Sequence, residues 1–265
     1  MNLTMIFGIT KNYFFHLCDL GRGPNYPVLL LPNDMKRLIL KECVGRGIRC
    51  LSDVLKNIIS LNDLSYLEIS GLDGIEFLLQ FSFAPTPCDQ LEVSSFSPLR
   101  NLQALMLNNL PNLVGLFYRK IEACLLPLGI FSSLTKLWIS YCHNMKQLFT
   151  IQLLQNLQNL EDLEIRNCEG LKQIATDDNG VGKGGKEGIQ LTSSEATTTI
   201  ILPKLRRLHL TWLPQLKNIC TAAMICDSIT EIEMFGCPKV EAAFVSSHHQ
   251  RTTICSQYSS QNQGR

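Results

Sequence analysis

One pattern of apolar positions returns seven times along the chain. It reads Leu-x-x-Leu-x-Leu-x-x-(Cys/Leu)-x-x-Leu-x-x-Leu, with Ile or Met replacing Leu in places. The clearest copies cover residues 102–116, 134–148, 160–174 and 205–219, and weaker copies begin at Met35, Leu64 and Ile229. A phrase that recurs every few dozen residues is typical of stacked repeats, each of which buries its apolar residues against its neighbours. The pattern therefore predicts a solenoid.

The spacing of the copies supports this prediction. The first apolar residue of each x-Leu-x-Leu core, here called the anchor, is Leu38, Leu67, Leu105, Leu137, Leu163, Leu208 and Ile232. The anchors lie 29, 38, 32, 26, 45 and 24 residues apart. Leucine-rich repeats are about 20–29 residues long, so three spacings fit and three contain insertions. Five residues after every anchor stands either Cys or Leu, which predicts a buried ladder position.

Alternation around each anchor predicts a short strand with Leu side chains inward and the intervening side chains outward. The expected fold is an α/β leucine-rich-repeat solenoid, a curved right-handed superhelix. Its parallel sheet would form the concave face, with turns, 3-10 segments or short helices on the convex face. We expect an atypical cap or linker over residues 1–30, about seven repeats over 31–245 with a flexible insertion at 176–200, and a disordered tail over 246–265.

Composition narrows the possible functions. The net charge of +1 gives no bulk reason to expect nucleic acid or an anionic membrane as partner. No apolar run reaches the ~18 residues of a membrane span. The eleven cysteines contain no C-x-x-C pair, and four of them hold the ladder position, where Cys acts as a small apolar side chain. We therefore expect reduced, structural cysteines, a reducing compartment and no metal site.

Catalytic interpretations are weaker than the structural ones. Gly180–Lys183 looks like part of a phosphate-binding loop, but Asp177 stands where the first Gly is needed and Gly184 where the hydroxyl is needed. Cys142 and His143 are neighbours on an extended segment, so their side chains should point in opposite directions. The sequence thus predicts neither an enzyme nor a cofactor. A nucleotide-binding or hydrolysis assay would reveal either.

The outward positions of the strands form the candidate protein-binding surface. Its members are Tyr66, Glu68, Met106, Lys136, Trp138, Asp162, Glu164, Arg166, Arg207, His209, Glu231 and Glu233. Asp162, Glu164 and Arg166 share one strand face and predict a mixed-charge patch. His209 is expected to be solvated. Trp138 has two interpretations of similar weight: an interface anchor, or a side chain that packs on Met106 and needs no partner.

The amino-acid sequences of the repeats also resemble those of a known protein family. Phrases such as NLQNLEDLEIRNCEGLKQI (156–174) and LPKLRRLHLTWLPQLKNIC (202–220) resemble the leucine-rich-repeat region of plant nucleotide-binding leucine-rich-repeat disease-resistance proteins, and most of all the coiled-coil subclass. The resemblance covers roughly residues 27–245.

The resemblance implies a cytoplasmic protein-interaction module of an immune receptor. Its partners would be a pathogen effector, a modified host protein, or a nucleotide-binding module restrained in cis or in trans. A different adaptor, such as the substrate-recognition subunit of a ubiquitin ligase, is the alternative. A helical F-box-like region upstream would favour that adaptor, and residues 1–30 do not show one.

Overall fold

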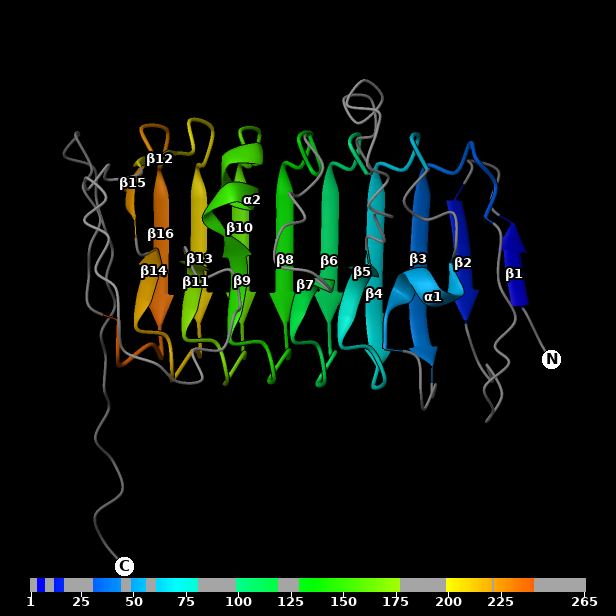
Figure 1. Ribbon diagram of the computed structural model, residues 1–265, viewed down its shortest axis with the longest axis horizontal. Helices are drawn as coiled ribbons and strands as arrows, with labels where there is room; N and C mark the ends of the chain where they lie inside the picture. The colour runs from blue at the N-terminus through cyan, green and yellow to red at the C-terminus, as the bar shows by residue number, and fades with distance from the viewer. Residues whose placement is uncertain are drawn as a thin grey trace, which may run out of the picture.

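The computed structural model describes residues 4–7, 12–16, 31–43, 49–55, 61–80, 99–118, 129–176, 199–220 and 222–240. These residues form a stack of coils in which one long sheet runs the length of the molecule (Figure 1). The N-terminal strands lie at one end of the stack and the last strand at the other. The predicted leucine-rich-repeat solenoid is therefore confirmed.

In the part of the chain that the structure describes, the long sheet has nine strands in the order β1-β2-β3-β4-β6-β8-β10-β13-β16. Their bounds are β1 Thr4–Phe7, β2 Asn12–His16, β3 Arg37–Cys43, β4 Tyr66–Leu72, β6 Ala104–Asn108, β8 Lys136–Ser140, β10 Asp162–Arg166, β13 Arg207–Thr211 and β16 Glu231–Phe235. All neighbours pair in parallel except β1 with β2. Two strands from the region expected to be a cap or linker thus extend the sheet.

The strand register follows the anchors. Leu38 pairs with Leu67, Leu67 with Leu105, and the pairing continues through Leu137, Leu163 and Leu208 to Ile232. Every anchor before Ile232 is buried, because each lies between two neighbouring coils. Ile232 is half-buried in the last described coil. The repeat register predicted from leucine spacing is confirmed.

The opposite layer differs in part from the prediction. It contains the short strands β5 Phe77–Gln80, β7 Gly115–Tyr118, β9 Gln147–Thr150, β11 Gln173–Thr176, β12 Thr199–Ile201, β14 Asn218–Cys220 and β15 Ala223–Ile225. These strands form one three-stranded and two two-stranded parallel sheets. The expectation of turns, 3-10 segments or short helices after each ladder position was too narrow, because turns here lead into strands that hydrogen-bond to the next coil.

Among the described residues, two short helices join the coils, α1 Leu51–Val54 and α2 Ile151–Asn156. Helix α2 begins after Thr150, whose hydroxyl accepts a hydrogen bond from the Leu153 N–H at 3.2 Å and so caps the first turn. Its apolar side chains are buried in the core. Most of the flexible insertion expected at 176–200, and all of the tail expected at 246–265, lie outside the described residues.

The ladder position lies in the core from the coil of β4 to that of β13, and Cys237 in the last described coil is half-buried. Cys142 and Cys168 are buried free thiols there, and Leu72, Leu110 and Leu213 are buried at the same place in other coils. A hydrogen bond with Cys168, together with burial, raises the pKa of the Cys142 thiol. Because both thiols are buried, these cysteines serve as small apolar side chains rather than as reactive groups.

In the long sheet, a left-handed residue stands at or beside the carboxyl end of β4, β6, β8, β10, β13 and β16. Four residues after the anchor, the backbone has positive φ at Gly71, Asn109, Tyr141, Asn167, Trp212 and Gly236. The N–H of this residue donates across the stack in four coils, for example from Tyr141 to the Arg166 carbonyl at 3.1 Å. The conformation turns the chain so that the next residue enters the core. Gly and Asn adopt it readily, whereas Tyr and Trp do not.

Candidate protein-binding face

The outward face of the nine-stranded sheet carries the predicted surface residues in straight rows. Register places Glu68, Met106, Trp138, Glu164, His209 and Glu233 side by side along the middle of successive strands. A parallel row of Tyr66, Lys136, Asp162, Arg207 and Glu231 runs beside it. Adjacent strands lie ~4.8 Å apart, so neighbouring side chains in a row can touch.

In the N-terminal part of this face, Tyr66 contacts side chains of its own strand and of both neighbouring strands. The Arg37 guanidinium carbon lies 3.7 Å from the centre of the Tyr66 ring. The Tyr66 hydroxyl donates to the Glu68 carboxylate at 2.8 Å and contacts the Met106 sulfur at 2.9 Å. Lys41 adds an ion pair to Glu68 at 3.2 Å. Burial and the hydrogen bond to Glu68 raise the pKa of Tyr66, so its hydroxyl stays a donor at neutral pH.

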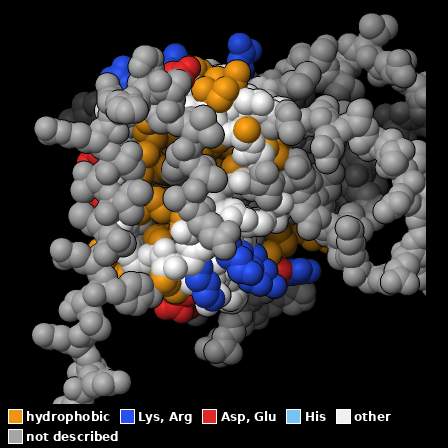
Figure 2. All heavy atoms as spheres, turned by 90° about the vertical axis from the view of Figure 1, so that its left-hand side faces the viewer, with side chains coloured by type: hydrophobic (Ala, Val, Ile, Leu, Met, Phe, Trp, Pro, Cys, Tyr) orange, Lys and Arg blue, Asp and Glu red, His pale blue; other side chains and the backbone are white. Residues whose placement is uncertain are grey.

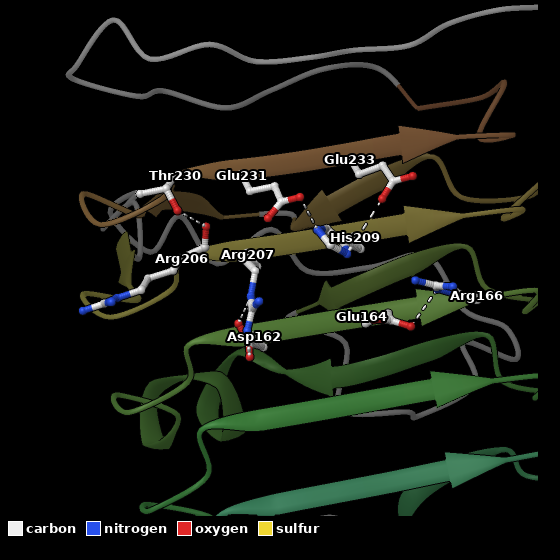
Figure 3. A network of polar contacts seen from close by, with 9 residues as sticks. All are labelled: Asp162, Glu164, Arg166, Arg206, Arg207, His209, Thr230, Glu231 and Glu233. Atoms are coloured by element: carbon white, nitrogen blue, oxygen red, sulfur yellow. Dashed lines mark hydrogen bonds and ion pairs between the residues drawn. The ribbon is translucent and has the colours of Figure 1, made fainter.

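The C-terminal part of the face contains a second set of ion pairs, drawn in Figure 3. The Arg207 guanidinium donates from two nitrogens to the two carboxylate oxygens of Asp162, each at 2.5 Å. These hydrogen bonds raise the pKa of Arg207. On the neighbouring row, Arg166 and Glu164 form an ion pair at 2.7 Å. The mixed-charge patch predicted for Asp162, Glu164 and Arg166 is therefore present, with Arg207 as an additional member.

Two residues differ from the sequence-based expectation. Asp162 is only 5% exposed, because Arg207 lies across it from the next strand. It therefore orients Arg207 and is not itself an accessible contact residue. The side chain of His209 is 17% exposed rather than solvated, and its ring nitrogens lie 3.3 Å from Glu231 and 3.8 Å from Glu233 (Figure 3). Both contacts become ion pairs only when the imidazole is protonated.

Strand β8 separates the two sets of contacts. Its outward residues Lys136 and Trp138 are exposed, Trp138 by 37%. Among the described residues, no hydrogen bond, ion pair or ring contact engages either side chain. Met106 pairs with Trp138 across the strands, but its sulfur contacts the Tyr66 hydroxyl. Packing against Met106 therefore leaves a large part of the indole accessible.

Sequence reasoning missed another group of exposed residues at the carboxyl ends of the strands. Tyr141 and Trp212 are 48% and 54% exposed, and both occupy the left-handed position. The signal was present in the sequence: four residues after the anchor, most coils carry Gly or Asn, and these two carry a large aromatic side chain. Alternation within the strands could not show this, because the position lies just beyond them.

Comparison with known protein families finds a match to part of the chain. The family model described as plant disease resistance protein RPS2-like, leucine-rich repeats, matches residues 118–253. That match spans the coils from β8 to β16, which hold Trp138 and the second set of ion pairs. No curated protein matches the chain. Within the described ranges, no helix is long and apolar enough to cross a membrane.

Proposed function

This chain belongs to the family of plant disease resistance protein RPS2-like leucine-rich repeats, and we propose that it is the recognition region of a cytoplasmic plant immune receptor. Membership marks it as a protein-interaction module in plant immunity. In the proposed role, the outward face of the sheet binds a pathogen effector or a modified host protein. The same face restrains a nucleotide-binding module of the coiled-coil subclass until that event.

The observation that carries the proposal is that Trp138 is exposed on the sheet face. Charged residues on both sides of β8 hold one another in fixed positions, whereas Trp138 and Lys136 lie between them without a polar partner among the described residues. A partly exposed Trp surrounded by ordered polar groups is the usual form of an interface anchor, since binding buries its apolar ring without breaking existing contacts. The neighbouring ion pairs then supply register and specificity rather than most of the affinity.

The test uses the purified full chain and the nucleotide-binding module of a coiled-coil-subclass plant disease-resistance protein, with association measured by biolayer interferometry. Trp138→Ala is expected to weaken binding by about 30-fold, which corresponds to ~2 kcal/mol for an anchor residue. Lys136→Glu is expected to weaken it less. Circular dichroism and the melting temperature should stay close to wild type, because both side chains are exposed.

Lys204→Ala provides the matched control. Lys204 is exposed outside the sheet face and contacts Asn159 at 2.6 Å, so its loss tests for general surface effects. Co-expression in leaf tissue gives the second readout: wild type should suppress cell death caused by an active nucleotide-binding module, and Trp138→Ala should not. Equal binding and equal suppression by Trp138→Ala and Lys204→Ala would show that the sheet face is not the recognition surface.

A further inference from the structure

A second surface follows the carboxyl ends of β8, β10 and β13, outside the sheet face. Here it is called the lower rim, because these ends point downward in Figure 1. It comprises the three turns 141–146, 167–172 and 212–217. At its sheet side stand Tyr141 and Trp212, two strands apart, with Asn167 between them. Large exposed aromatic side chains in left-handed backbone are unfavourable in themselves, and such outliers concentrate at functional sites.

Trp212 is held in place although it is exposed. Its ring meets Phe235 edge to face with centroids 4.9 Å apart. It also lies against Gly236, where an added Cβ would stand 2.9 Å from the indole. Tyr141 has a similar edge contact with His143 at 6.4 Å. The indole is therefore a rigid, partly exposed apolar surface, which loses little side-chain entropy when a ligand covers it.

The other side of the lower rim is a row of three lysines. Lys146, Lys172 and Lys217 occupy the same place in successive coils, nine residues after the anchors. Their backbones are joined directly: Lys172 N–H donates to the Lys146 carbonyl at 2.8 Å, and Lys217 N–H to the Lys172 carbonyl at 2.9 Å. All three side chains are exposed. In the part of the chain that the structure describes, no carboxylate or other group pairs with these ammonium groups.

This arrangement of charge is specific to one part of the stack. In earlier coils the same place holds Glu76, which pairs with Arg49 at 2.6 Å, and then Val114. Like charges at matching positions of neighbouring coils repel one another, so the lysine row destabilises the free protein. Figure 2 views the C-terminal end of the stack and shows Lys and Arg side chains along its lower margin, with some Asp or Glu among them, and further Lys and Arg along its upper margin. An anionic ligand would remove the repulsion.

We propose that the lower rim binds an acidic segment of a partner protein, with carboxylates on the lysine row and apolar side chains against Tyr141 and Trp212. Charge complementarity with aromatic contact favours a protein over a polyanion. Glu169 lies in the middle turn, where its exposed carboxylate repels anions. A peptide can place an uncharged residue opposite Glu169, whereas a continuous phosphate backbone cannot. Three lysines would also give nucleic-acid binding with a salt slope of only about −2 to −3, which corresponds to weak binding.

The experiment measures fluorescence anisotropy of a labelled peptide in which Glu alternates with Leu, bound to the full chain. The same peptide with Gln replacing Glu tests the charge. The triple variant Lys146→Glu, Lys172→Glu, Lys217→Glu should bind at least about tenfold more weakly. The matched control variant replaces Lys36, Arg100 and Arg206 by Glu. These three residues are exposed near the amino ends of β3, β6 and β13. The control variant changes the net charge equally and should bind within about twofold of wild type.

Two further variants make the test specific. Trp212→Ala should weaken binding of the Glu-Leu peptide, whereas Trp138→Ala on the sheet face should leave it unchanged, which separates this proposal from the proposed function. If the triple Glu variant fails to fold by circular dichroism, the corresponding triple Gln variant replaces it.

The proposal is overturned by any of three results. The first is no saturable peptide binding, and the second is equal loss in the control triple variant. The third is tighter binding, through the same lysines, of oligo-thymidine or of phosphatidylserine-containing vesicles.

Discussion

Replacing Leu137 by Ala tests the stacking of the coils most directly. Leu137 is the anchor of the central strand β8 and is fully buried between Leu105 and Leu163. The change removes three carbon atoms, and at ~0.8 kcal/mol for each buried methylene the transfer term alone is about 2.4 kcal/mol. A cavity that cannot collapse adds ~24 cal/mol per Å³, so we expect a loss of about 2–5 kcal/mol in the free energy of unfolding.

Ile232→Ala provides an internal comparison at the same register position. Ile232 is half-buried, and β16 has a described neighbour on one side only. About half of the burial is absent before the substitution, so the expected loss is ~1–2 kcal/mol. Lys136→Ala, an exposed change on the strand of Leu137, should stay within about 0.5 kcal/mol of wild type.

Urea denaturation followed by circular dichroism gives these free energies, and hydrogen exchange locates the damage. Amides in β6 and β10 should lose protection in Leu137→Ala, because each coil is stabilised mainly by its neighbours. In Ile232→Ala the loss should be confined to β13 and β16. Equal costs for Leu137→Ala and Ile232→Ala, or a cost for Leu137→Ala no larger than for Lys136→Ala, would refute the stacking argument.

Two other substitutions and one alkylation measurement have defined outcomes. Tyr141→Asn should raise the unfolding free energy by about 1 kcal/mol, because Asn tolerates the left-handed conformation that Asn109 and Asn167 already adopt; a decrease in urea stability would contradict the strain. Gly236→Ala should cost ~1–3 kcal/mol and red-shift Trp212 fluorescence, since φ is +68° and the new Cβ would press on the indole; an unchanged spectrum would argue against that contact. Burial raises the pKa of Cys226 to about 12 from 9.0, so the native thiol should resist iodoacetamide at pH 8 and react in urea. The contribution of the buried, protonated thiol to the free energy of unfolding should be present below pH 9 and lost toward pH 12. Rapid alkylation of the native thiol, detected by mass spectrometry, would contradict its burial.

The sequence was sufficient for the anchored strands of the long sheet and insufficient for β1, β2 and the layer opposite. Anchors such as Leu105 and Leu137 repeat because each must fill the same space in the core, so their spacing contains the strand register. The segments Gln147–Thr150 and Gln173–Thr176 have no comparable period. They are strands because the coils bring them into parallel pairing. Pairing between residues far apart in the chain cannot be predicted from the sequence of a four-residue segment.

The candidate surface shows the same division between local pattern and long-range contact. Alternation correctly placed Asp162 and Arg207 on the outward face, but it could not show that Arg207 covers Asp162 from a strand 45 residues later in the chain. The left-handed backbone at Tyr141 and Trp212 could not be predicted from either residue alone, because local propensity favours Gly or Asn there. Only the aligned coils show that these two aromatic residues occupy a glycine-like position.

The two surfaces should differ in how they bind. On the sheet face, most charges already have partners, so a ligand that competes for Asp162 or Glu164 must first break an ion pair such as Arg207–Asp162. Net affinity should therefore concentrate on Trp138, and salt should affect it weakly. On the lower rim, Lys146, Lys172 and Lys217 repel one another before binding, so a carboxylate gains attraction and relieves repulsion together. Binding there should weaken steeply as salt is added, since exposed charges are screened within about 10 Å at 0.1 M ionic strength. A salt titration of both complexes thus distinguishes the surfaces without any substitution: equal salt dependence would mean that one surface serves both ligands.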